Sequence, residues 1–117
     1  MNIYLAGPMR GYPEFNFPAF MKAASELRSQ GHTVFNPAER DIERDGVSWG
    51  EQVPDGDIVK SEALGFDRRV AILDDLQYII NHADAIALLP GWRESKGANA
   101  EYWTSRFLDL EIIELAA

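Results

Sequence analysis

The chain has 117 residues, 46% of them hydrophobic, and a net charge of −8, values that predict one globular domain over residues 1–117. The negative charge argues against binding to DNA or RNA, and the absence of cysteine excludes disulfides and thiolate metal sites. With no basic leader and no apolar run near the ~18 residues of a membrane span, we expect a cytoplasmic protein without a membrane partner.

The first third of the chain predicts a strand, a helix and a second strand. Residues 2–6 are apolar and end at Gly7, as a short buried strand would. Asn16 is a suitable N-cap for a helix with helically spaced apolar residues, and Gly31 ends that helix. Residues 32–35, "HTVF", form the second predicted strand, which the following Asn-Pro pair closes.

The rest of the chain begins with a charged, weakly patterned segment, residues 38–65, which predicts a long loop with one short helix. Such a loop would serve as a lid or as an interface arm. Beyond it, the pattern predicts a helix over 66–82, a strand over 84–89, a helix over 98–108 and a final strand over 110–115.

Strands that alternate with helices indicate an α/β fold, here a single flavodoxin- or Rossmann-like domain. Its parallel sheet would have four to five strands, with helices on both faces. Ligands of such folds bind at the carboxyl ends of the strands. We therefore expect three segments to meet at one rim: "GPMRGY" after the first strand, "NPAER" after the second and "PGWRESKGANAE" after the third.

The loop after the first strand contains Gly7, Arg10 and Gly11, but neither of the glycine-rich patterns that bind dinucleotides or ATP. Its glycines permit a ligand to approach the backbone closely. Arg10 offers a planar fork for a phosphate or a carboxylate. The alternative is a tight turn that carries a surface arginine.

The loop after the third strand is richer in polar groups. Ser95, Lys96 and Gly97 come just before a predicted helix, where a hydroxyl, an ammonium group and free N–H groups suit an anion. The alternative is an ordinary helix cap with a solvated lysine. Trp92 and Tyr12 lie in the rim loops, where they would either stack on a base or sugar or be partly buried against the end of the sheet.

Two carboxylates are candidates for chemistry at this rim. Glu101 follows the start of the last helix, whose dipole would keep it ionised; alternatively it is a helix-start glutamate without a chemical role. In the preceding helix, Asp74 is expected to point to solvent and Asp75 to lie at the edge of an apolar arc. Asp75 is therefore a candidate for a raised pKa or, alternatively, for a salt bridge at the boundary. The arc consists of Ile72, Leu73, Leu76, Ile79 and Ile80.

Three segments, "IYLAGPMRG", "DDLQYIINHADAIALLPGW" and "SKGANAEY", resemble the nucleoside 2-deoxyribosyltransferase-like superfamily, and most closely a bacterial and phage branch of unknown function. The resemblance covers nearly the whole chain except residues 41–65. The superfamily includes deoxyribosyltransferases and 2′-deoxynucleoside 5′-phosphate N-hydrolases. The resemblance implies a small nucleotide or nucleoside as ligand and a homodimer or higher homo-oligomer. We expect no cofactor and no metal.

The resemblance also implies roles for the catalytic candidates. Glu101 falls on the nucleophilic glutamate of the family and Tyr4 on the tyrosine that orients it. Asp75 falls on the helical aspartate that protonates the departing base or fixes the sugar and base. Hydrolysis would then proceed through a glycosyl-enzyme ester.

The phosphate-binding positions of the N-hydrolases fall on Arg10 and Ser95. Pro8 departs from the pattern, because the N-hydrolases have a phosphate-binding serine there. The expected substrate-binding residues are Gly7, Arg10, Gly11, Trp92, Ser95, Lys96 and Gly97.

The preferred functional hypothesis is hydrolysis of the N-glycosidic bond of a 2′-deoxynucleoside 5′-monophosphate. Transfer of the deoxyribosyl group is an alternative. Hydrolysis is favoured because the chain lacks the long C-terminal tail that the transferases extend into a neighbouring subunit. A nucleotide-binding module without catalysis is a second alternative. A structural or interaction protein acting through residues 41–65 is a third.

Overall fold

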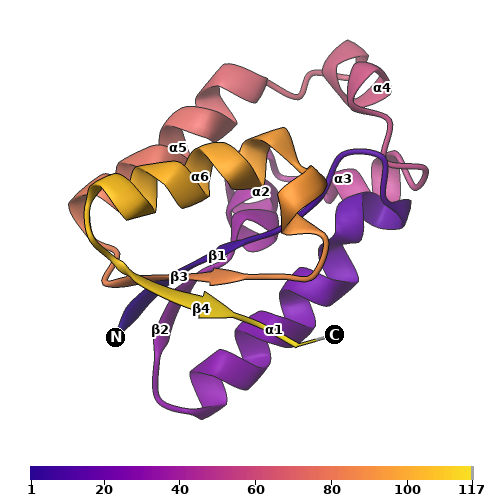
Figure 1. Cartoon of the computed structure of the whole chain (residues 1–117). Helices are drawn as coiled ribbons and strands as arrows, with labels where there is room; N and C mark the ends of the chain where they lie inside the picture. Colours follow the sequence, from indigo (N-terminus) through magenta and orange to yellow (C-terminus); the bar gives the residue numbers. More distant parts are fainter. Residues whose placement is uncertain (117) are drawn as a thin grey trace.

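The fold is a four-stranded parallel sheet with helices on both faces (Figure 1). The structure is a computed structural model that describes residues 1–116. The strands lie in the order β2-β1-β3-β4, so that β1 pairs with both β2 and β3. This arrangement confirms the predicted α/β fold with a flavodoxin- or Rossmann-like sheet. The strand bounds are β1 (Asn2–Ala6), β2 (Thr33–Phe35), β3 (Ala85–Leu88) and β4 (Glu111–Glu114).

Helices cover the sheet unequally. α1 (Phe17–Ser29) packs on one face, and α5 (Arg68–Asn81) and α6 (Lys96–Phe107) lie side by side over the other (Figure 1). Two one-turn 3-10 helices, η1 (Pro13–Asn16) and η2 (Trp92–Glu94), precede α1 and α6. Right-handed crossovers require this division, because the chain moves to one side of β1 to form β2 and to the other side to form β3 and β4.

The central strand β1 sends alternate side chains into two cores. Ile3 and Leu5 belong to the core beneath α1, whereas Tyr4 and Ala6 belong to the core beneath α5 and α6. All four are buried, as the continuous apolar pattern predicts for a strand covered on both faces. Because β1 lies where the strand order reverses, the loops after β1 and β3 diverge and leave room for a ligand between them.

Asn16 does precede α1, but its side chain forms no cap. Its backbone is left-handed, with a φ of 61°, and its amide Nδ2 donates to the carbonyl oxygen of Pro8. The predicted N-cap is therefore wrong in its geometry. The side chain instead ties the start of α1 to the loop after β1, which is the loop expected at the ligand.

The predicted long loop over 38–65 is wrong. Three helices occupy the region: α2 (Pro37–Asp45), α3 (Trp49–Gln52) and α4 (Ile58–Ala63). Local caps start two of them, since Asn36 accepts from the N–H of Ala38 and Asp57 from that of Val59. These helices are too short and too charged to show a clear apolar period, and so the periodicity did not reveal them.

The predicted apolar arc of α5 is also wrong in part. Ile72, Leu73 and Ile80 are exposed, while Ile79 is buried. The helix is turned because Asp74 does not point to solvent: its Oδ2 accepts from Arg40 Nε at 3.2 Å and from Arg44 Nη1 at 3.1 Å, both on α2. This rotation moves Asp75 from the edge of the arc toward the interior.

A short strap holds the loop after β1 against the segment between α3 and α4. The N–H of Gly11 donates to the carbonyl oxygen of Gly56 at 2.8 Å, and that of Glu14 donates to Pro54 at 2.8 Å. Gly56 has a φ of 70°, and a Cβ there would overlap the carbonyl oxygen of Tyr12. Glycine at this position therefore permits the two segments to touch.

Replacement of this glycine gives a testable prediction. Gly56→Ala is expected to lower the free energy of unfolding by about 1–3 kcal/mol more than Gly46→Ala. Gly46 is the matched control, because its φ is 73° but nothing lies within 4 Å of its would-be Cβ. Both variants therefore carry the left-handed cost of about 1–2 kcal/mol, and only Gly56→Ala adds the steric overlap. Urea denaturation measures the free energy of unfolding of both variants. Equal losses would show that the strap moves to accommodate the added methyl group without cost.

Within the described residues, no helix is long and apolar enough to cross a bilayer.

Candidate active site

A cavity of about 410 Å³ opens at the carboxyl ends of β1 and β3. Its volume falls in the range of small-molecule sites. Parts of all three predicted rim segments line it, together with residues from α2, α3, α4 and α5. Four aromatic side chains from η1, α1 and α3 line it, those of Phe15, Phe17, Phe20 and Trp49.

Tyr4 and Glu101 meet in this cavity although 97 positions separate them in sequence. Tyr4 Oη donates to Glu101 Oε2 at 2.6 Å. The Tyr4 ring is fully buried and stacks on Phe35 at a centroid distance of 5.5 Å, so its hydroxyl has a fixed position. Glu101 Oε1 has no hydrogen bond within residues 1–116, and this oxygen is not fully buried. Because Glu101 lines the cavity, Oε1 opens toward it. One oxygen is therefore held while the other is available to a ligand.

Asp75 lines the same cavity, one helix away from Glu101. Its Oδ1 is the single buried side-chain oxygen or nitrogen in the described part of the chain that lacks a hydrogen-bond partner. An unpaired buried oxygen costs free energy unless the group becomes neutral or a ligand pairs with it. Burial, together with the charges of Glu101 and Asp41, raises the pKa of Asp75 to about 9.

The two acids therefore differ in proton affinity. Burial also raises the pKa of Glu101, to about 7, but the hydrogen bond from Tyr4 acts in the opposite direction. Since the pair repels when both groups are ionised, the first proton leaves Glu101 and the second stays on Asp75. An ionised Glu101 beside a protonated Asp75 is the combination of a nucleophile with an acid.

The expected effect of the helix dipole on Glu101 is corrected by the structure. α6 begins at Lys96, two residues earlier than predicted, so Glu101 lies in the second turn. The field of the helix N-terminus weakens beyond the first turn. Burial dominates instead, and it raises the pKa of Glu101 rather than lowering it.

Asp41, on α2, also lines the cavity, as does the exposed Glu94 of η2, and the sequence analysis missed Asp41. Its side chain is buried, and Oδ1 accepts from Arg44 Nη2 at 2.9 Å. Burial raises the pKa of Asp41 to about 6. A signal was available, because Asp41 directly follows the "NPAER" rim segment, but it fell within the region predicted to be irregular.

Two cations of the cavity come from the two loops predicted to hold an anion, and a third, Arg68 on α5, pairs with Glu62 at 2.8 Å. Arg10 follows β1, Lys96 begins α6, and both are exposed. Within residues 1–116, neither is within ion-pair distance of a carboxylate, although the chain has a net charge of −8. Gly7 lines the same region, where a Cβ would lie 2.7 Å from the Leu89 side chain. This end of the cavity therefore suits an anionic group.

Ser95 forms the ordinary helix cap that the sequence analysis gave as the alternative to an anion site. It caps α6, its Oγ accepting from the N–H of Ala98 at 3.2 Å, which leaves its own hydrogen free to donate. Gly97 lies beside it on the cavity wall. Gly11 does not line the cavity; it has a φ of 82° and belongs to the strap.

The chain matches the domain of unknown function DUF4406 over residues 1–114. It belongs to this family. No curated protein and no solved structure matches the chain. The site of this DUF4406 domain must therefore be interpreted from its own geometry.

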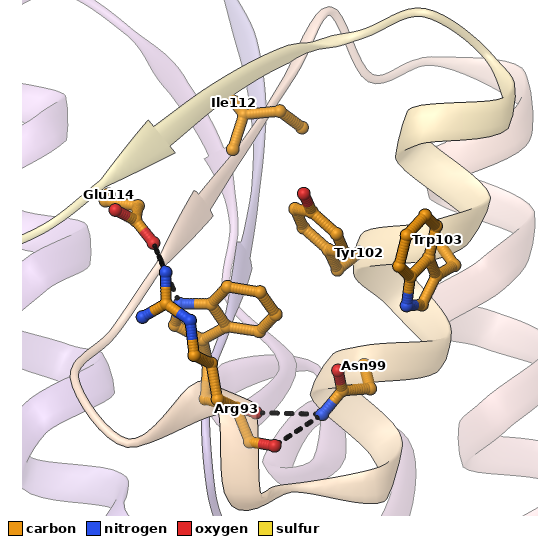
Figure 2. Close-up of a pocket in the computed structure, with 7 residues that line it drawn as sticks. Arg93, Asn99, Tyr102, Trp103, Ile112 and Glu114 are labelled. Carbon is orange, nitrogen blue, oxygen red and sulfur yellow. Dashed lines mark hydrogen bonds and ion pairs between the residues drawn. The ribbon is translucent and has the colours of Figure 1, made fainter.

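Trp92 is not brought to the cavity of the DUF4406 domain. It lines a separate open groove that shares no residue with the cavity. Figure 2 shows this groove, with Tyr102 and Trp103 from α6 and Ile112 and Glu114 from β4. The Trp92 ring packs on Tyr102 at a centroid distance of 4.6 Å, and its Nε1 donates to Glu114 at 3.3 Å. These contacts turn it away from the rim, so the alternative of burial against the sheet describes it. Tyr12, by contrast, lines the cavity.

Within residues 1–116 of the DUF4406 domain, no group of three or more histidine, aspartate or glutamate side chains is arranged to hold a metal ion.

Proposed function

We propose that the protein hydrolyses the N-glycosidic bond of a 2′-deoxynucleoside 5′-monophosphate. The observation that supports this most strongly is the pairing in one cavity of a tyrosine-held glutamate with an aspartate whose buried oxygen has no partner. Two carboxyl groups of different protonation state are what glycosidic cleavage requires. The resemblance to the nucleoside 2-deoxyribosyltransferase-like superfamily supports the same reaction.

The reaction has two balanced steps. Glu101 Oε1 attacks the anomeric carbon, forming a glutamyl ester as the carbon–nitrogen bond breaks and its electron pair leaves with the base. Asp75 gives its proton to the departing base. Ionised Asp75 then accepts a proton from water, which cleaves the ester, releases deoxyribose 5-phosphate and regenerates both groups. Tyr4 holds Glu101 Oε2 throughout and orients the attacking oxygen.

The 5′-phosphate would bind at the cationic end of the cavity. Arg10 supplies a fork, Lys96 an ammonium group and Ser95 a hydroxyl donor. Pro8 lines the cavity in place of the serine of the N-hydrolases, and it provides neither a hydroxyl nor an N–H. Arg10 and Lys96, both without a carboxylate partner in the described chain, would compensate for that loss.

A substrate panel tests this proposal. Purified protein is incubated with the deoxynucleoside monophosphates and with the corresponding nucleosides, and free base is measured by chromatography. We expect base release from monophosphates, faster than from nucleosides. Release that requires a second base would indicate the transferase, and tight nucleotide binding without any release would indicate a binding module.

The proposal includes a cytoplasmic homo-oligomer, as the resemblance implies. α5 presents a groove with exposed Ile72, Leu73 and Ile80, and the residues that line this groove include Arg69 but no carboxylate. In a chain of net charge −8, a surface that is apolar and free of acids suits contact with a second copy. Ile72 lines the cavity as well, so a second copy on this groove would lie beside the cavity.

A further inference from the structure

Asp41 lines the cavity and has no part in the proposed bond cleavage. Its side chain belongs to a residue that is only 7% exposed. Oδ1 accepts from Arg44 Nη2, and within the described chain no hydrogen bond reaches Oδ2. Oδ2 is not fully buried, and because Asp41 lines the cavity this oxygen opens toward it. A buried acid thus offers one acceptor oxygen to a ligand.

Arg44 fixes this carboxylate from behind. It also binds Asp45 at 2.9 Å and Asp74 at 3.1 Å, and it does not line the cavity. Asp74 also pairs with Arg40, so two guanidinium groups face three carboxylates and the cluster stays negative. Burial raises the pKa of Asp41 to about 6, so at pH 7.5 it is mainly ionised and accepts but does not donate.

The place of Asp41 in the cavity determines which part of a bound nucleotide lies beside it. The unpaired cations Arg10 and Lys96 come from the loop after β1 and the start of α6, whereas Asp41 comes from α2. A phosphate beside Asp41 would be repelled and would move to the cations. If the phosphate lies at these cations and the sugar lies at Glu101, the base would lie in the part of the cavity that Asp41 and the aromatic Phe66 line.

We propose that Asp41 accepts a hydrogen bond from the exocyclic amino group of the base, so that the substrate carries adenine or cytosine rather than uracil, thymine or hypoxanthine. This inference rests on the proposed function for the orientation of the ligand. The physical reason is that a base carbonyl in this place would put two acceptors face to face and leave Asp41 Oδ2 without a donor.

Two matched pairs of substrates test the inference: deoxycytidine against deoxyuridine monophosphate, and deoxyadenosine against deoxyinosine monophosphate. Each pair exchanges an amino group for a carbonyl and shifts one ring proton. We expect kcat/KM to favour the amino member at least tenfold. Asp41→Asn, whose amide both donates and accepts, is expected to bring the ratio close to one. Asp74→Asn is the control, because Asp74 binds the same arginine but does not line the cavity, and it is expected to keep the ratio.

The same comparison can be made without turnover. Calorimetry measures the Kd of the four nucleotides for Glu101→Gln, with and without Asp41→Asn. A tenfold preference that depends on Asp41 supports the inference even if the wild-type protein releases no base, in which case only the proposed hydrolysis fails. Equal affinities within each pair, or a loss in Asp41→Asn that is the same for all four nucleotides, would overturn the role of Asp41.

Discussion

Glu101→Gln is expected to reduce base release at least about 10³-fold, because an amide oxygen cannot serve as the attacking carboxylate. The variant should fold, since glutamine keeps the shape of the side chain and an acceptor for Tyr4 Oη. It also removes a buried ionisable group whose pKa is raised by burial. Single-turnover assays with a radiolabelled monophosphate would measure the rate, and thermal denaturation would verify the fold.

The matched control for this variant is Glu94→Gln. Glu94 also lines the cavity, but it is exposed and belongs to η2, so its neutralisation removes the same charge from the same cavity. We expect Glu94→Gln to retain base release within about threefold, since exposed charges are screened by solvent. Base release that persists in folded Glu101→Gln would refute Glu101 as the nucleophile, whatever the control does.

Asp75→Asn is expected to remove most of the pH dependence of stability between pH 7.5 and 8.5. Because the pKa of Asp75 is about 9 in the folded protein and near 4 in an unfolded chain, the folded state holds a proton that unfolding releases. Its stabilising contribution is complete below pH 4 and is lost as the pH rises through 9. The free energy of unfolding of the wild-type protein should therefore fall by about 1.4 kcal/mol per pH unit in this window.

Urea denaturation at pH 7.5, 8.0 and 8.5 measures this slope for both proteins. Asp74→Asn is the control from the same helix. It breaks ion pairs to Arg40 and Arg44 and is expected to lose a similar amount of stability at each pH, with the wild-type slope unchanged. A slope in Asp75→Asn equal to that of the wild-type protein would show that Asp75 is not the group that holds the proton.

Part of the site could be predicted from the sequence, because the patterns that carry it are local. Glycines and an arginine follow the first strand, and a serine and a lysine precede the last helix, so the rule for parallel sheets places both at one rim. The resemblance added Tyr4, Asp75 and Glu101 as a group. The hydrogen bond between Tyr4 and Glu101 agrees in geometry with the orienting role that the resemblance implied.

Other features depended on contacts between distant segments. Trp92 follows a rim strand like its neighbours, but Tyr102 and Glu114 turn it to another surface. Asp41 was hidden because α2 is nine residues long and mostly charged, which gives no clear apolar period. Its burial becomes evident only when Arg44 gathers Asp41, Asp45 and Asp74 around one guanidinium.

The sequence by itself determined the α/β order, the central buried strand and the rim on which the polar loops meet, because apolar periodicity and turn residues act over a few positions. Only the tertiary structure decided the rotation of α5, the burial of Asp75 Oδ1 and the meeting of Asp41, Asp75 and Glu101 in one cavity. Burial and mutual charge set their proton affinities, and both depend on what packs around a side chain rather than on its neighbours in sequence.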